Sequence, residues 1–424
     1  MNRVSRRVFS LGALSSAWLL VLGAGCASSP SSVPPPPPSS AAPVAAAAGT
    51  GGAAAATNPK GAPVVVARAP YDAPAAAPHT IDVELQTRAA KEILASLSRP
   101  KYDSTDARIL EDMLAVRFAI RDSQRGADVF ERDFAAAFDE KTKTSVFDFR
   151  SIRESRDRWQ ILLDAIAFRE KDIVRLASMR AAALLPGDRP ISVRLDVFLS
   201  FGLAGLGDHI VLKGENGREV MVIDLSRAIG DSEGEPLDSR ISRIARVIAG
   251  EAFREAWAAY RAESPAWEHP DPQLGQLDVL LRAVAEAGPV AVYSVDENFF
   301  PLSVWLKEPM RRAVDDLNRR ADRFAEAANN LERRMDLTGE VRRPDFMGRV
   351  AGQDGAFLVD GIVETSGLSA LRQALQAGPR AFFDAYAHAA AANKELAPLA
   401  KSIRERLAGT PTRPAPKAGA PVNP

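Results

Sequence analysis

The sequence predicts an α+β protein that is mainly helical, with a helical N-terminal half, a small antiparallel sheet with a hairpin, and a helix-rich C-terminal portion. Apolar residues recur at three- and four-residue spacing over most of residues 81–185 and 238–407. One interval between them, residues 191–225, alternates in places and carries an Asn-Gly turn. The composition, 46% hydrophobic and 25% charged, is that of a folded globular chain.

Three helical segments account for the N-terminal half. The periodicity predicts helix over residues 81–97, 106–123 and 152–185. Polar residues at 103–106 supply candidate N-caps for the second segment, and Pro186-Gly187 ends the third.

The strands follow directly. Residues 191–202 (ISVRLDVFLSFG) predict one strand, and residues 209–225 predict a hairpin that turns at Gly214-Glu215-Asn216-Gly217. After Asp238 the helical spacing returns and continues to Leu407, so the sheet is a small insertion in a mainly helical chain.

The first 26 residues predict a lipoprotein signal peptide. A basic start precedes an apolar run at residues 11–22 that is short for a membrane span. Residues 5–9 (SRRVF) resemble the twin-arginine export motif. Residues 22–26 (LGAGC) resemble a bacterial lipobox, which implies that Cys26 is acylated and binds the lipid membrane. An ordinary cleaved signal with an incidental cysteine is the alternative.

The remaining boundaries follow from composition. Residues 27–79 are rich in proline, alanine and serine and predict a disordered tether, residues 80–408 predict the folded domain, and residues 409–424 predict a disordered tail. A tethered, acylated domain implies a cell-envelope location, on the periplasmic or outer-surface side of a membrane. The net charge is zero, so no nucleic-acid partner is expected.

Histidine is scarce, which limits the metal chemistry that the chain can perform. The four histidines, at positions 79, 209, 269 and 388, include no pair at metal-ligand spacing. The sequence contains no G-x-S-x-G, phosphate-binding glycine loop, EF-hand or C-x-x-C motif. Asp208-His209 could form a catalytic pair, although a single histidine at a strand edge is more often hydrogen-bonded only for structure.

One helical stretch, VIAGEAFREAW at residues 247–257, is two substitutions from a zinc-binding helix. Histidines at Gly250 and Arg254 would create the motif HExxH, in which two imidazoles bind zinc and the glutamate, here Glu251, activates the metal-bound water. Helical geometry places these three residues on one side. An apolar stripe occupies the other side: Ile241, Ile244, Ala245, Ile248, Ala252 and Ala256.

Two interpretations of this stretch stay open. Val247 and Trp257 lie on the same side as Glu251, which predicts the wall of a cleft rather than a solvated face. Alternatively, Glu251 and Arg254 form an ordinary surface pair at i,i+3 spacing.

The order of the elements resembles that of the gluzincin-like zinc-dependent peptidases. In that family an edge strand precedes the HExxH helix, and a second helix supplies a glutamate ligand in a motif like E-G-x-A-x-Y. Residues 287–293 (AGPVAVY) resemble this second motif, with Ala287 at the glutamate position. Residues 352–386 resemble the C-terminal helices of such domains, so the resemblance spans residues 191–386.

The resemblance implies a degenerate site. Gly250, Arg254 and Ala287 stand where the three zinc ligands would be, so we expect no zinc and no other metal, and Glu251 remains as a vestigial general base. Arg254 would pair with Glu251 in place of the metal charge. A histidine at position 250 should fit, because the family holds an imidazole there.

Three functions remain open at this stage. The expected function is a binding or structural role, without catalysis, toward a peptide or an envelope protein. One alternative is an active hydrolase with a relocated metal or carboxylate site that uses Glu251, together with Glu286 and Glu255. The other alternative is a helical envelope scaffold that is unrelated to peptidases.

Overall fold

A computed structural model describes residues 79–139, 141–202, 207–213, 218–229, 235–295 and 303–409. The predicted signal peptide with Cys26, the tether, the turn at 214–217 and the C-terminal tail beyond Gly409 lie outside the described residues. Within the ranges given, no helix combines the length and the apolar character that crossing a membrane requires.

The sheet has four strands in the order β1-β2-β4-β3. Its strands are β1 (Thr80–Gln86), β2 (Ser192–Ser200), β3 (His209–Lys213) and β4 (Glu219–Asp224). β1 and β4 both pair with β2 in parallel, whereas β3 pairs with β4 antiparallel, with His209 opposite Ile223 and Lys213 opposite Glu219. The hairpin prediction is confirmed in its strand pairing, but the sheet is mixed rather than antiparallel.

The prediction of one helix over residues 81–97 is wrong in its first half. Ile81, Val83 and Leu85 alternate with polar residues, and Val83 and Leu85 are buried against the core. The same three residues also fit a helical spacing with the apolar residues that follow them, and so the alternation was missed. Only α1 (Arg88–Leu97) is helical in this segment.

The other N-terminal helices are shorter than predicted. They are α2 (Ser104–Glu111), α3 (Leu114–Asp122), α4 (Ala127–Ala135), η2 (Ala136–Phe138), α5 (Phe149–Glu154), α6 (Arg156–Phe168) and α7 (Glu170–Ala183). Asp103 begins α2 and Asp148 begins α5, and each side chain accepts a hydrogen bond from a backbone N–H of the first turn.

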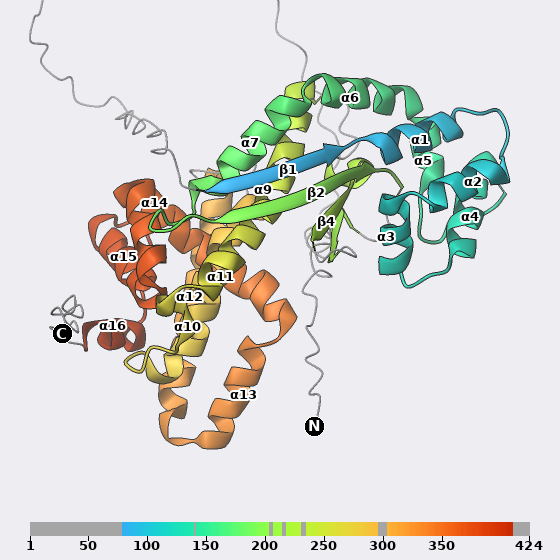
Figure 1. The fold of residues 1–424 in the computed structure, drawn as a ribbon. Helices are drawn as coiled ribbons and strands as arrows, with labels where there is room; N and C mark the ends of the chain where they lie inside the picture. The colour runs from blue at the N-terminus through green and yellow to red at the C-terminus, as the bar shows by residue number, and fades with distance from the viewer. Residues whose placement is uncertain are drawn as a thin grey trace, which may run out of the picture. The chain divides into compact units, whose positions relative to one another are not determined.

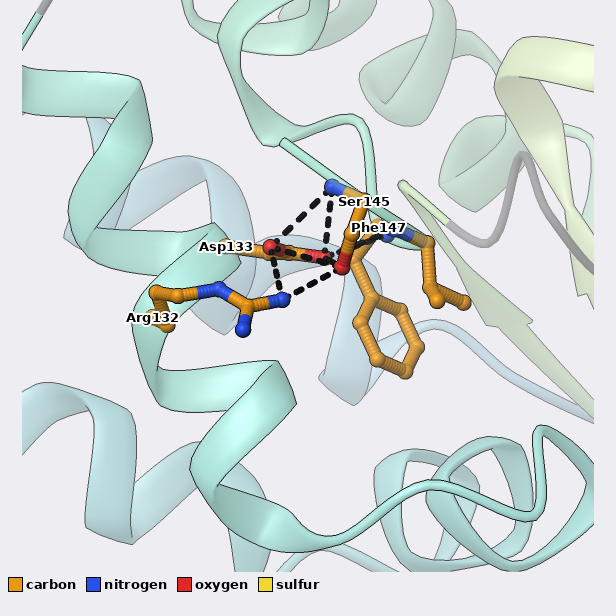
Figure 2. A network of polar contacts seen from close by, with 5 residues as sticks. Arg132, Asp133, Ser145 and Phe147 are labelled. Atoms are coloured by element: carbon orange, nitrogen blue, oxygen red, sulfur yellow. Dashed lines mark hydrogen bonds and ion pairs between the residues drawn. The ribbon is translucent and has the colours of Figure 1, made fainter. Parts of the chain in front are cut away.

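A buried carboxylate fixes the connection between α4 and α5. Asp133 is fully buried and accepts hydrogen bonds from the backbone N–H groups of Ser145, Val146 and Phe147 at 2.8–3.2 Å (Figure 2). The Ser145 hydroxyl and the Arg132 guanidinium also bind it. Burial alone would raise the pKa of the Asp133 carboxyl, but these hydrogen bonds outweigh burial and hold that pKa below its ordinary value.

The long helix α9 (Leu237–Ala262) follows the short α8 (Leu225–Ala228) and packs against α7, β1 and β2 (Figure 1). The apolar stripe predicted for it is confirmed, because all six of its residues are buried. This burial holds α9 against the sheet and leaves its other side toward β3, β4 and the next long helix.

Helices and the loops that join them make up the C-terminal portion, and no strand occurs among its described residues (Figure 1). Its elements are α10 (Pro265–Glu268), η4 (Gly275–Leu277), α11 (Asp278–Val295), α12 (Val304–Glu326), η5 (Ala327–Asn329), α13 (Leu331–Val341), the π-helical η6 (Phe346–Ala351), α14 (Gly352–Ala377), α15 (Pro379–Ala392) and α16 (Lys401–Ala408).

The closest contact in this portion lies between α11 and α14. A Cβ atom at Gly288 would lie 2.5 Å from the backbone carbon of Gly355, and a Cβ at Gly355 would lie 2.4 Å from the Cα of Gly288. Glycine at both positions therefore allows the two helix backbones to touch. This contact sets the position of α11, which in turn covers the Gly250 side of α9.

Candidate functional site

The Gly250–Arg254 stretch lies on α9 beside the antiparallel strands β3 and β4. Strand alternation places Glu219, Met221 and Ile223 on one face of β4, and His209 lies opposite Ile223 on the same face. Arg254 of α9 reaches Glu219, and Glu251 lies within electrostatic range of His209. The site therefore draws on two strands as well as the helix.

Three carboxylates converge on a single nitrogen of Arg254. Its Nη2 atom lies 2.5 Å from Oε1 of Glu251, 3.0 Å from Oε2 of Glu219 and 3.0 Å from Oε1 of Glu255. Its Nε atom also donates to Glu251 at 2.8 Å. The predicted pair between Arg254 and Glu251 is thus present, but it is the centre of a larger group, which we call the Arg254 cluster: Glu219, Glu251, Arg254 and Glu255.

The close approach of three carboxyls in the Arg254 cluster shifts the pKa values of its members. Burial and the neighbouring carboxyls of Glu255 and Glu251 together raise the pKa of Glu219 to about 8, against the opposing effect of Arg254. Burial acts to lower the pKa of Arg254, but its contacts with Glu251, Glu219 and Glu255 outweigh burial and raise it. One cation therefore holds three buried or half-buried carboxyls together.

His209 borders the cluster and is oriented by its neighbour in sequence. Its Nδ1 atom lies 3.0 Å from Oδ1 of Asp208, which also accepts the backbone N–H of His209. Burial acts to lower the pKa of His209, but Asp208 and Glu251 outweigh this effect and raise it. The histidine is thus held by Asp208 and stabilised in its charged form beside Glu251.

Position 250 is closed by α11. A Cβ atom at Gly250 would lie 2.9 Å from the Cβ of Tyr293 and 3.5 Å from its Cγ. The Tyr293 hydroxyl donates to the carbonyl of Arg180, which anchors the ring. The expectation that a histidine fits at position 250 is therefore wrong for this arrangement of the helices.

The expected cleft wall is likewise covered at Trp257. This side chain is buried, stacks on Phe253 and Tyr260, and donates its indole N–H to the carbonyl of Glu286 on α11 at 3.0 Å. Packing between two long helices explains an aromatic residue on this side of α9 without a cleft.

The remaining predicted residues of the site lie on α11. Ala287 is half-buried and packs against the hydrophobic core. Glu286 forms an ion pair with Arg261 at 2.9 Å, one helical turn or more beyond the Arg254 cluster on α9. Glu251 therefore shares the Arg254 guanidinium with Glu219 and Glu255, whereas Glu286 pairs with Arg261 and is not part of the cluster.

The residues present do not fit a catalytic zinc ion. Such a site needs three ligating side chains, usually including histidine, and an open position for water. Here Gly250 and Ala287 have no donor atom, and the Arg254 guanidinium fills the point on which the three carboxylates converge. Within the described ranges, no group of three or more His, Cys, Asp or Glu side chains is arranged to hold a metal ion.

Sequence reasoning missed Glu219 and His209 as neighbours of Glu251. Glu219 begins a strand whose next four residues are apolar and buried, and an acidic residue directly before such a run is a detectable signal. Its contact with Arg254 spans 35 residues of sequence. No local spacing rule encodes such a contact.

These features define the class of protein: a helix-rich α+β domain in which a long helix carries the Arg254 cluster beside a small mixed sheet. A comparison with family models identifies the family. The chain belongs to the family described as "Putative zinc dependent peptidase (DUF5700)", whose model matches residues 108–395, about two-thirds of the chain. This membership disfavours a scaffold that is unrelated to peptidases. No curated protein and no solved structure matches the chain.

Proposed function

We propose that this chain is a metal-free and catalytically inactive member of its family. The observation that carries the proposal is the convergence of Glu219, Glu251 and Glu255 on one nitrogen of Arg254, within 3.0 Å. A fixed guanidinium supplies the positive charge that a metal would otherwise supply, and it donates to the carboxylate oxygen Oε1 of Glu251, the vestigial general base. With Glu251 bound in this way, its carboxylate is engaged by Arg254 rather than directed at a metal-bound water.

The role that remains for the domain is to bind an extended peptide or an envelope protein. Among the described strands β3 ends the sheet order, so one of its edges has no partner strand there. An extended peptide can pair with such an edge through main-chain hydrogen bonds. The charged side chains of His209 and the Arg254 cluster lie beside this strand and would favour particular side chains of the peptide.

The proposed location is the cell envelope, with the domain anchored on the periplasmic or outer-surface side of a membrane. This part rests on the sequence: the apolar run at residues 11–22, the twin-arginine-like motif and the single cysteine, Cys26. Cys26→Ser should release the protein from the membrane fraction and remove an acyl-dependent mass increment. Retention of the variant, with no acyl group on the native chain, would refute the anchor.

Metal analysis tests the central proposal. The chain should be expressed in zinc-replete medium, purified without chelator or refolding, and measured by elemental analysis. We expect well under one zinc per chain. Stoichiometric zinc that survives dialysis would overturn the proposal.

A peptide assay tests the binding role. Unfolded casein peptides should bind to the chain in native mass spectrometry and should be recovered intact after long incubation. Cleavage that is lost in Glu251→Gln would instead establish a hydrolase.

One observation favours that second candidate function, a metal-independent hydrolase. Glu219 has a pKa of about 8 next to other carboxyls, and two acidic groups with separated pKa values can act as acid and base. His209, held by Asp208 near Glu251, would be a further proton carrier. Glu219→Gln should abolish any such activity without metal dependence, which distinguishes it from contaminating metallopeptidases.

A further inference from the structure

The helices α12 and α13 form an antiparallel hairpin at an edge of the domain (Figure 1). Two ion pairs join the two helices, Arg323 with Glu340 at 3.6 Å and Arg333 with Glu326 at 3.5 Å. On the inner side of α13, Leu337 is buried against the core. The hairpin therefore holds α13 in a fixed position and leaves its outer side toward solvent.

The outer side of α13 carries an apolar stripe that no described residue covers. Leu331 is 64% exposed, and Met335, one turn further on, is 66% exposed. Gly339, after another turn, is also exposed, and the exposed Arg342 follows as the C-cap in a helical conformation. Because residues three and four apart lie on the same side of a helix, these four residues form one continuous surface.

Gly339 has no structural reason within a single copy of the chain. Glycine is less favourable than alanine in a helix interior, and no described atom lies within 4 Å of the Cβ that alanine would add. Elsewhere in the domain, Gly288 and Gly355 allow the backbones of two helices to touch. The outer side of α13 therefore has the form of a helix-packing surface whose second helix is not among the described residues.

The charges along this surface are complementary to themselves. Glu332 and Asp336 lie in the N-terminal half of α13, whereas Arg342 and Arg343 lie at its C-terminal end, and all four side chains are exposed. Two parallel copies of α13 would place like charges together. Two antiparallel copies place the acidic half of each helix against the basic end of the other, so charge complementarity favours a second copy of this chain as the occupant.

We propose that two copies of the chain associate through α13, with the two helices packed antiparallel about a twofold axis at the level of Leu337. Met335 of each copy then fills the space over Gly339 of the other copy. Glu332 of each copy pairs with Arg342 of the other, so every contact occurs twice. Helix α13 has 11 residues and is about 16 Å long. Such a contact covers less than the roughly 800 Å² per partner of a standard interface, and we expect a dissociation constant on the order of 10–100 μM.

Two charge reversals test this arrangement, because the twofold axis decides their outcome. Two arginines face each other at both contacts in Glu332→Arg, and two glutamates do so in Arg342→Glu. Each variant alone should therefore associate about tenfold more weakly than the native chain. An equimolar mixture of the two variants restores an acidic and a basic partner at both contacts, and should form the mixed dimer with about the native affinity.

Sedimentation velocity of the full chain, from about 5 to about 200 μM, measures the association, and native mass spectrometry of the mixture separates mixed dimers from dimers of one variant. Every chain in these experiments carries Cys26→Ser, which prevents both acylation and a disulfide between two copies. Thermal denaturation of each variant confirms that it is folded.

Two further variants test the packing of the stripe. Met335→Ser removes the inserted side chain, and Gly339→Lys fills the space that receives it. Both should weaken association about fivefold or more, while the exposure of the two positions allows the chain to fold normally. Ile161→Ser alters a residue of α6 that is 65% exposed, so it is the matched control and should associate as the native chain does.

Four results would overturn the proposal: a native chain that stays monomeric over the whole concentration range, single charge reversals that associate like the native chain, a mixture of the reversals that associates no more strongly than either alone, or a dimer that survives both packing variants. The outer side of α13 shares no residue with β3 or with the Arg254 cluster, so the zinc and peptide experiments above are unaffected by any of these results.

Discussion

Two acidic groups in this chain, the buried Asp133 and the half-buried Glu219, have pKa values that are shifted in opposite directions. Asp133 is surrounded by three successive backbone N–H groups, a hydroxyl and a guanidinium, and its pKa is depressed (Figure 2). Glu219 shares the Arg254 guanidinium with Glu251 and Glu255, and burial together with its hydrogen bond to Glu255 raises its pKa to about 8.

The difference indicates what each site is for. Backbone donors fixed by the fold stabilise the ionised form of Asp133, and the carboxylate in return fixes the loop, which is a structural role. In the Arg254 cluster three carboxyls share one cation, so the ionised carboxylates repel one another. Carboxyls with strongly shifted pKa values that lie close together are typical of functional sites.

The largest effect should follow from Asp133→Ala. Removal of the carboxylate leaves the N–H groups of Ser145, Val146 and Phe147 buried without an acceptor. We expect a loss on the order of 3–5 kcal/mol in the free energy of unfolding, measured by urea denaturation at pH 7. Asp139→Ala in the same loop, an exposed carboxylate, is the control and should lose far less.

The pH dependence of this contribution has a defined sign. The pKa of Asp133 is lower in the folded than in the unfolded chain, so the stabilisation is complete above the ordinary carboxyl pKa of about 4. It is lost as pH falls through the folded pKa. The native chain and Asp133→Ala should therefore differ less in stability near pH 2 than at pH 7, and an unchanged difference would contradict the assignment.

The Asp133 network also shows where sequence reasoning ends. Ser145, Val146 and Phe147 carry no turn signature that identifies an anion-binding backbone, and the acceptor lies 12–14 residues earlier. The buried stripe of α9 was predictable because Ile241, Ile244 and Ile248 repeat with the period of the helix itself.

Long-range pairing explains the remaining errors. The local pattern around Ile81 is compatible with a helix, and only its parallel pairing with Val193 on β2, more than 100 residues away, selects the strand. The motif positions Gly250, Glu251 and Arg254 lie on one helix side as predicted, whereas the obstruction at Gly250 comes from Tyr293 on another helix. Spacing rules encode the first kind of fact and not the second.

The next largest effect should follow from Arg254→Ala, which leaves three carboxyls without their cation. We expect a loss of about 2–3 kcal/mol at pH 8, discounted because the arginine is partly exposed, and a smaller loss at pH 5, where protonation relieves the repulsion. Calcium or magnesium should restore part of the stability of this variant by occupying the vacated point.

Two controls sharpen this result. Arg254→Lys retains a charge but, as a point charge on a flexible stem, should lose an intermediate amount of stability. Arg261, which like Arg254 lies on α9, forms an ion pair with Glu286 of α11. Arg261→Ala breaks this pair and should show no response of stability to divalent cations. If Arg254→Ala is as stable as the native chain and insensitive to cations, the guanidinium does not hold the cluster together.

A smaller effect should follow from Gly250→Ala. Alanine favours a helix over glycine by up to about 1 kcal/mol, but here its Cβ would lie 2.9 Å from the Cβ of Tyr293. We expect a net loss of about 1 kcal/mol by thermal denaturation, because α11 must shift. Gly339→Ala on α13, where no atom lies within 4 Å of the new Cβ, is the matched control and should gain stability.

The same geometry bears on whether a metal site can be rebuilt. The triple variant Gly250→His, Arg254→His, Ala287→Glu would need α11 to move before an imidazole fits at position 250. We therefore expect it not to bind zinc at micromolar concentration in isothermal titration. Tight zinc binding in this variant would show that α11 yields easily and that the site has lost little besides its ligands.

The smallest effect should follow from Glu219→Gln, which replaces the carboxyl by a neutral group of the same shape. Between about pH 4.5 and pH 8 the folded chain binds a proton at Glu219 that the unfolded chain has released, so this residue makes stability fall as pH rises. Asp354, whose burial raises its pKa to about 7, contributes in the same direction between about pH 4 and pH 7, and His209, whose pKa is raised, does so above its ordinary pKa of about 6.5. The difference in stability between the native chain and Glu219→Gln contains the contribution of Glu219 and not those of His209 and Asp354, which are the same in both chains.

We expect the Glu219→Gln variant to be more stable than the native chain by about 1 kcal/mol at pH 9, and equal to it at pH 4, where both side chains are neutral. Glu364→Gln, which alters an exposed pair with Lys307, should leave the slope unchanged. A variant that is less stable than the native chain at pH 9 would mean that the ion pair with Arg254 outweighs the repulsion among the carboxyls, and the contrast with Asp133 would disappear.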